Sequence, residues 1–171
     1  MSPDEGASDR TMPTRSTGAA SVSARLDELG ITLPPVAKPL AAYTPATRVG
    51  SQVWTSGQLC SVNGELVAVG KVGAEVSADE ATRAARICAL NALAAAAEVA
   101  GGVDAITRIV KLVVFVASDP GFTGQPAVAN GASQLMGEIF GEAGVHVRSA
   151  VGVSVLPLDA AVELELVVET S

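Results

Sequence analysis

The chain has 171 residues and a net charge of −7, and 49% of its residues are hydrophobic although only 3% are aromatic. The length favours a single domain, and the excess of acidic residues argues against nucleic-acid binding, because phosphate recognition depends on clustered lysines and arginines. No apolar run reaches the roughly 18 residues of a membrane helix, and the first residues lack the pattern of a signal peptide, so we expect a cytoplasmic protein with no membrane contact.

The N-terminal segment, residues 1–20, is rich in Ser, Thr, Gly, Pro and Asp and has almost no large apolar residues. Such a segment cannot bury enough surface to become ordered, so we expect a flexible tail without chemistry, followed by one domain over residues 21–171. The domain begins with a predicted short helix from Ser21 to Leu29, which Gly30 would end.

Three short strands are predicted after this helix, because their residues are apolar and are separated by turn-forming residues. Asn63-Gly64 is a strong hairpin signal, and Gly57 marks a point where the backbone must come close to another group. The predicted strands run from Leu40 to Thr47, from Gln52 to Ser56 and from Glu65 to Val69, and Arg48 to Ser51 would form the first turn.

The second half of the chain alternates long helices and strands. Ser77 and Glu80 form a capping box at the start of a helix that should end at Ala100, and Gly101 follows it. The other predicted elements are a strand from Ile106 to Ala117, a helix from Gln125 to Phe140, and strands from Arg148 to Val155 and from Ala161 to Val168. The order β-β-β-α-β-α-β-β, behind a short extra helix, predicts an α+β fold in which both long helices cover one face of a mixed sheet.

Two charged residues open the last two predicted strands. The guanidinium of Arg148 offers a planar fork of donors that fits a carboxylate, and the carboxylate of Glu163 can orient a water molecule or move a proton. The pair therefore suggests a site for a small carboxylic acid. The alternative is a salt bridge across a β-hairpin, since most charged residues serve only solvation.

The motif around these residues resembles the signature of the YjgF/RidA family, also called L-PSP-type proteins or reactive-intermediate deaminases. The similar positions are Arg148 to Val153, Leu156-Pro157 and Val162 to Glu165. The resemblance extends from about Val22 to Glu169, and several ordered motifs over that length are more specific than any one of them. It includes Tyr43, the "TSGQ" element in Trp54 to Gln58, the strand Val110 to Val116, and Asn130 to Ser133.

The resemblance implies a chorismate-mutase-like α+β sandwich that assembles as a homotrimer, with active clefts between subunits. It implies hydrolytic deamination of reactive 2-imino and enamine acids to 2-oxo acids and ammonia, without a cofactor or metal. In this pattern Arg148 clamps the substrate carboxylate and Glu163 orients the attacking water. The further substrate-binding positions that the resemblance implies are Tyr43, Ser56, Gly57 and Asn130.

Some residues depart from the family pattern or fit it poorly. Many members carry cysteine two residues after the arginine, where this chain has Ala150, which leaves the substrate range open. Cys60 and Cys88 are expected to be small buried hydrophobes, and His146 a residue at the surface or the rim of the cleft. A trimer that binds small carboxylic acids without catalysis, or a regulatory member of the family, is the alternative, whereas the acidic charge and single histidine disfavour RNA cleavage.

Overall fold

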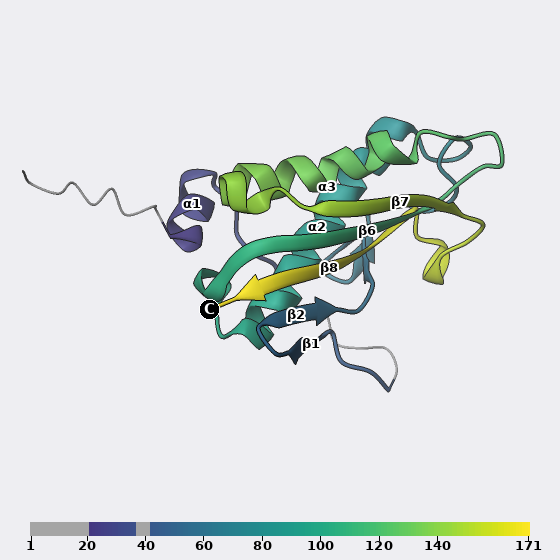
Figure 1. Ribbon diagram of the computed structural model, residues 1–171. Helices are drawn as coiled ribbons and strands as arrows, with labels where there is room; N and C mark the ends of the chain where they lie inside the picture. The colour runs from purple at the N-terminus through teal and green to yellow at the C-terminus, as the bar shows by residue number, and fades with distance from the viewer. Residues whose placement is uncertain (1–20, 37–41) are drawn as a thin grey trace, which may run out of the picture.

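A computed structural model describes residues 21–36 and 42–171 of the chain, and the expected tail, residues 1–20, lies outside this range. The described residues form one mixed sheet and a small two-stranded ladder, together with three α-helices and short 3-10 turns (Figure 1). The helices are α1 (Val22–Glu28), α2 (Ala78–Ala100) and α3 (Gln125–Phe140). The strands are β1 (Ala46–Val49), β2 (Gln52–Thr55), β3 (Gln58–Leu59), β4 (Ser61–Val62), β5 (Glu65–Leu66), β6 (Ile106–Ala117), β7 (Val147–Val153) and β8 (Val162–Thr170).

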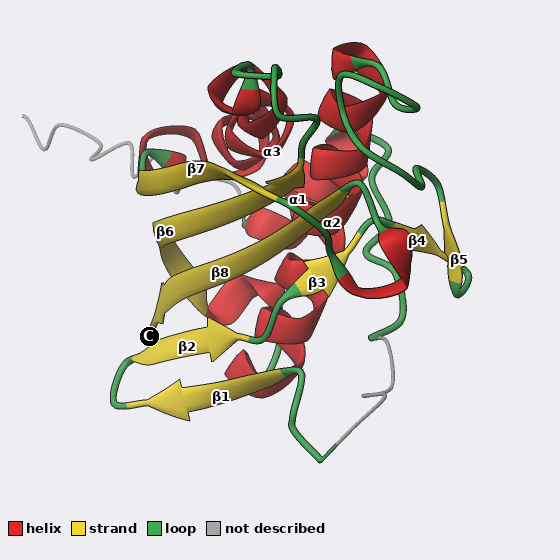
Figure 2. Cartoon of the chain, turned by 90° about the vertical axis from the view of Figure 1, so that its right-hand side faces the viewer, coloured by secondary structure: helices red, strands yellow, loops and turns green. Residues whose placement is uncertain are grey.

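The main sheet has the strand order β1-β2-β8-β6-β7, and β3 also pairs with β8. Only the pairing of β6 with β7 is parallel, and all other neighbours are antiparallel. Helices α2 and α3 lie together on one face of the sheet, as predicted, while no described element covers the other face (Figure 2). The predicted α+β fold, with both long helices on one face of a mixed sheet, is confirmed. For brevity, the two faces are called the helix face and the open face.

Helix α2 is held by small residues and by its caps. Ser77 and Glu80 form the predicted capping box, and Gly101 ends the helix in the left-handed conformation at φ 91°. Where α3 crosses α2, Gly131 leaves no room for a side chain, because a Cβ there would overlap the backbone carbonyl oxygen of Thr82. Alanine-rich surfaces and this glycine bring the two helices close together, and this compensates for the scarcity of large aromatic side chains in the core.

Two of the predicted strands were placed wrongly. The first strand is β1 (Ala46–Val49), so the turn lies at Gly50 and Ser51, and the part of the prediction on residues 40 and 41 lies outside the described residues. The third strand keeps only β5 (Glu65–Leu66), which pairs with β4 through the predicted Asn63-Gly64 turn. Val69 instead forms an isolated bridge to Ala160, so tertiary contacts override the local strand propensity here.

The prediction that the last two strands could form a β-hairpin was also wrong. Strand β6 lies between β7 and β8, parallel to the first and antiparallel to the second. The connection therefore crosses over β6 through a 3-10 turn in which Leu158 and Asp159 have φ values of 57° and 61°. As a result β7 is an edge strand of the sheet.

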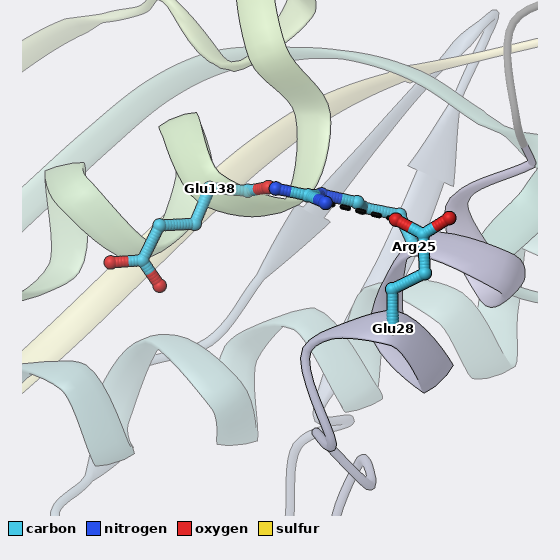
Figure 3. A network of polar contacts seen from close by, with 3 residues as sticks. All are labelled: Arg25, Glu28 and Glu138. Carbon is cyan, nitrogen blue, oxygen red and sulfur yellow. Dashed lines mark hydrogen bonds and ion pairs between the residues drawn. The ribbon is translucent and has the colours of Figure 1, made fainter.

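Helix α1 is the short extra helix that the sequence predicts, and it packs beside α3. Arg25 donates from Nε to the backbone carbonyl of Glu138 at 2.9 Å and pairs through Nη1 with Glu28 (Figure 3). Ser23 holds the other end of the helix by donating from its backbone and its hydroxyl to Asp104. An exposed ion pair contributes little by itself, so the bonds to α3 and Asp104 are what fix α1 in place.

Both cysteines are buried and free of disulfide bonds, in agreement with their predicted role as core residues. The Cys88 thiol donates to the carbonyl of Val162 at 3.4 Å, and burial raises its pKa well above the ordinary value. Among the described residues, no helix combines the length and the apolar composition needed to cross a membrane.

Candidate functional site

Arg148 lies on the helix face of the sheet. It is paired across β6 and β8 with Leu112 and Leu166, which are fully buried. Directly paired residues on neighbouring strands point to the same side of a sheet, and the guanidinium contacts α3. Because β7 is an edge strand, the arginine is only half-buried and stands at the border of the subunit.

The guanidinium of Arg148 is held by three acceptors from α3. Nη1 donates to Oδ1 of Asn130 at 2.8 Å and to the hydroxyl of Ser133 at 3.1 Å, and Nη2 donates to the carbonyl of Pro126 at 3.0 Å. An arginine has five N–H donors, so two donors, on Nε and Nη2, have no partner among the described residues. Two adjacent donors are what a carboxylate accepts side by side.

Ser133 links this arginine to His146. The Ser133 hydroxyl is 3.0 Å from Nε2 of the imidazole, and Nδ1 is 2.6 Å from the carbonyl oxygen of Gly144. A carbonyl oxygen only accepts, so the hydrogen-bond partners assign a proton to Nδ1, and in this tautomer Nε2 accepts from the serine hydroxyl. The half-buried histidine is therefore connected to Arg148 through one side chain, that of Ser133.

Glu163 lies on the open face. Its neighbours along β8, Val162 and Leu164, are fully buried against the helices, and successive residues of a strand point to opposite sides. Burial raises the pKa of the Glu163 carboxyl, and the carboxylate of Glu165, on the same face, raises it further. The described residues give Glu163 no hydrogen-bond partner. Within one subunit, therefore, no hydrogen bond from these residues offsets the desolvation cost of the ionised carboxylate.

Gly57 makes the space that the Glu163 carboxylate occupies. A Cβ at position 57 would overlap Oε1 of Glu163, which confirms the predicted close approach at this glycine. The approach arises at a bulge, because the pairing of β2 and β3 with β8 shifts by one residue between Trp54 and Gln58. The hydroxyl of Thr55 accepts from the backbone N–H of Leu166 at 3.0 Å and replaces the lost ladder bond.

Arg148 and Glu163 are therefore not brought together within one subunit. They project from opposite faces of the sheet and from strands separated by β6, so the predicted alternative of a salt bridge across a hairpin is excluded. The structure instead forms two half-sites. One gathers Arg148, Asn130, Ser133 and His146 at the edge of the sheet, and the other joins Glu163 to Gly57.

The remaining predicted site residues lie near the second half-site or at the surface. Ser56 donates its hydroxyl to the carbonyl of Thr44 at 2.6 Å, so this hydroxyl is already engaged. Tyr43, next in the chain to Thr44, is 48% exposed. The backbone N–H of Ser56 also donates to Pro45, so these bonds tie the segment containing the tyrosine to the end of β2.

A hollow of about 440 Å³ borders the first half-site, because His146 is among the residues that line it. Neither Arg148 nor Glu163 belongs to this lining. The residues that line it are Gln52, Arg108, Val110, Val145, His146, Val147 and Glu169.

Sequence reasoning missed the contacts that link Ser133 and His146 to Arg148. The only signal for His146 is its position two residues before Arg148, which places both on one side of an extended segment. Pro126 contributes a backbone carbonyl, which no side-chain pattern could indicate.

Comparisons with known proteins agree with this architecture. "Protein TCP17" of Trypanosoma cruzi is 44% identical over 149 residues, which cover 86% of this chain and 93% of that protein. The crystal structure of the protein Atu1372 from Agrobacterium tumefaciens is 43% identical with a TM-score of 0.79, covering 88% of this chain and 94% of that one. Escherichia coli TdcF, crystallised with bound serine, is 25% identical with a TM-score of 0.58, covering 81% and 94%.

The match to a protein family covers most of the domain. Residues 23–170 match the family described as "YjgF/chorismate mutase-like, putative endoribonuclease". This range contains both half-sites and every described helix and strand except the first residue of α1. On this evidence the chain belongs to the YjgF family.

Proposed function

We propose that the protein is a homotrimeric hydrolase that converts reactive 2-imino and enamine acids to 2-oxo acids and ammonia. Arg148 binds the substrate carboxylate, and Glu163 of a neighbouring subunit orients the attacking water. The observation that carries the proposal is the guanidinium of Arg148, which α3 fixes through three bonds while two donors are left for a ligand.

The separation of the two half-sites supports a site shared between subunits. Arg148 and Glu163 lie on opposite faces of one sheet, so a substrate a few atoms long could reach both only if they came from different chains. Arg148 stands on the edge strand β7, where a second copy has access.

Exposed apolar residues on the open face support the assembly itself. Trp54 is 48% exposed, Val147 is 65% exposed, and both lie in one cross-strand row with Val167 and Lys111. Val151, four residues further along β7 and on the same face, is 43% exposed. Soluble monomers rarely expose contiguous apolar surface, and a second and third copy of the chain would cover it.

The reaction requires only a group that binds the substrate carboxylate and a general base. Glu163 takes a proton from water as the oxygen bonds to the imine carbon, and this proton passes to the imine nitrogen, which gives a neutral carbinolamine and returns Glu163 to its ionised form. The C–N bond then breaks as the carbinolamine hydroxyl loses its proton to the nitrogen through Glu163, so that ammonia leaves and the carbonyl group forms. A raised pKa makes the Glu163 carboxylate a stronger base than an exposed glutamate, and no metal or cofactor is needed to balance the step.

A relative supports the class of ligand. TdcF was crystallised with serine, a small molecule with one carboxylate and a nitrogen on the adjacent carbon. A 2-imino acid has the same two groups in the same relation.

The decisive experiment is a turnover assay with 2-iminopropanoate, generated in situ from alanine by an amino-acid oxidase. The protein should accelerate decay of the imine above its spontaneous rate, and Arg148→Ala should abolish the acceleration. If the wild-type trimer binds pyruvate but leaves imine decay unchanged, the protein binds small carboxylic acids without catalysis.

A further inference from the structure

We propose that His146 is a positioning residue for Arg148, and that it acts through the hydroxyl of Ser133. The inference rests on the proposed function in one respect, namely that Arg148 binds the substrate carboxylate. His146 lies outside the motif that carries the family resemblance. Its contact with Ser133 would explain why the guanidinium of Arg148 keeps one orientation.

The direction of each hydrogen bond in this series follows from its last acceptor, the backbone carbonyl of Gly144. The carbonyl of Gly144 fixes the proton of His146 on Nδ1, so Nε2 accepts the proton of the Ser133 hydroxyl. The oxygen of Ser133 then presents its lone pairs to Nη1 of Arg148 at 3.1 Å. Without the histidine, the serine hydroxyl could rotate and no longer offer its lone pairs to the arginine.

Another hydroxyl in the same protein shows what Ser133 would do without His146. Serine and threonine inside helices commonly donate to the backbone carbonyl four residues earlier. In α2, Thr82 does so by donating to Ala78 at 2.8 Å. Ser133, inside α3, donates instead to His146 and makes no such bond to Ala129 in the structure.

For Arg148, the consequence concerns which N–H donors of the guanidinium remain free for the ligand. Nη1 has two hydrogens, which go to Asn130 and Ser133, and the bond from Nη2 to Pro126 uses a third donor. These three bonds hold the plane of the guanidinium and leave two donors, on Nε and Nη2, for a ligand. Loss of the Ser133 contact would leave one hydrogen of Nη1 free, and the plane could rotate toward it.

The test compares His146→Ala with His146→Gln, because glutamine has an acceptor oxygen near the position of Nε2 but no group that transfers protons. In imine hydrolysis, His146→Ala should raise KM about tenfold, the order expected for a lost bond to a charged group, with little change in kcat. His146→Gln should restore most of the affinity. A fall in kcat that glutamine does not restore would overturn the proposal in favour of proton transfer by His146.

Ser133→Ala supplies an independent check. If both residues act in one chain of contacts, the double variant Ser133→Ala with His146→Ala should be no worse than either single variant. Additive losses in KM would show that His146 acts by another route, and an unchanged KM in His146→Ala would show that it does not act at all.

Crystal structures of the ligand-free variants separate this proposal from the proposed function. In His146→Ala the Ser133 hydroxyl should turn toward the carbonyl of Ala129 and the Arg148 guanidinium should be displaced, whereas His146→Gln should keep both in place. These structures test the positioning even if the protein hydrolyses no imine. An unmoved guanidinium in His146→Ala would overturn the inference, whatever the result of the activity assays.

Discussion

Arg148 and Glu163 lie on opposite faces of the same sheet, with strand β6 between the strands that carry them. Each has its own surroundings. Three acceptors on α3 hold the arginine, and Gly57 leaves room for the carboxylate of the glutamate. A reaction that uses both groups therefore requires at least two copies of the chain.

Mixing two inactive variants tests this requirement directly. Arg148→Ala and Glu163→Gln should each be nearly inactive alone, yet trimers that contain both variants should regain about one third of wild-type activity, because one of the three sites in each mixed trimer then has both native residues. Co-expression with two different affinity tags and imine turnover of the doubly purified trimers would measure it. Mixed trimers as inactive as the two parents would place both groups in a single chain.

Replacement of Arg148 by lysine should fail to restore function. The ammonium group keeps the charge, but it cannot bond Asn130 and Pro126 while also gripping a carboxylate with two donors. We expect Arg148→Lys to recover little of the roughly 2–4 kcal/mol of transition-state binding that Arg148→Ala removes. The measurement is kcat/KM for imine hydrolysis, and a lysine variant with nearly native efficiency would show that charge alone suffices.

The pH dependence of turnover should report on Glu163. Its carboxyl must be ionised to act as the base, so kcat should rise with pH through a pKa above the ordinary glutamate value of 4.5. Glu165→Gln removes the neighbouring like charge that raises this pKa, so the rise should move to lower pH in that variant. A pH profile that Glu165→Gln leaves unmoved would argue against Glu163 as the titrating group.

The same raised pKa affects stability with a defined sign. Below 4.5 the carboxyl is protonated in both the folded and the unfolded chain, so Glu163→Gln should change the melting temperature little. As the pH rises, the unfolded chain ionises first, and the wild-type protein loses stability until the folded-state pKa is passed. The glutamine variant should therefore melt above the wild type at neutral pH, as thermal scans across this range would show.

Gly57→Ala should displace the Glu163 carboxylate. The added methyl group would occupy the position of Oε1, so we expect kcat to fall by roughly 100-fold, the order for loss of a positioned base. Gly137→Ala is a matched control, because that helical glycine has open space beside it and alanine should raise stability slightly, by about 0.4–1 kcal/mol. Native turnover in Gly57→Ala would mean that the carboxylate does not need this position.

The sequence predicted the long elements well, because their signals are local. The capping box at Ser77 and the valine-rich run from Ile106 gave the start of α2 and both ends of β6. The relation between Arg148 and Glu163 could not be obtained in this way. Nearness in sequence suggests a hairpin, and nothing in the residues from 154 to 161 indicates that a strand formed forty residues earlier lies between the two.

The support of Arg148 escaped prediction for a related reason. Its acceptors come from one face of α3, a helix whose angle to β7 depends on packing against α2, where Gly131 meets Thr82. Asn130 was identified through the family resemblance, whereas Ser133 and His146 become partners only once that packing is known.

Ala150 lies two residues after Arg148 on the same strand, and therefore on the face that holds the arginine. Under the proposed function, this departure from the family pattern falls on the face that binds the substrate carboxylate, whereas Glu163, the proposed base, lies on the opposite face. In each subunit, the residues proposed to bind the substrate and the residue proposed to react with it lie on opposite faces of the sheet. Descendants of a common ancestor could therefore diversify in what they accept while inheriting the same reaction.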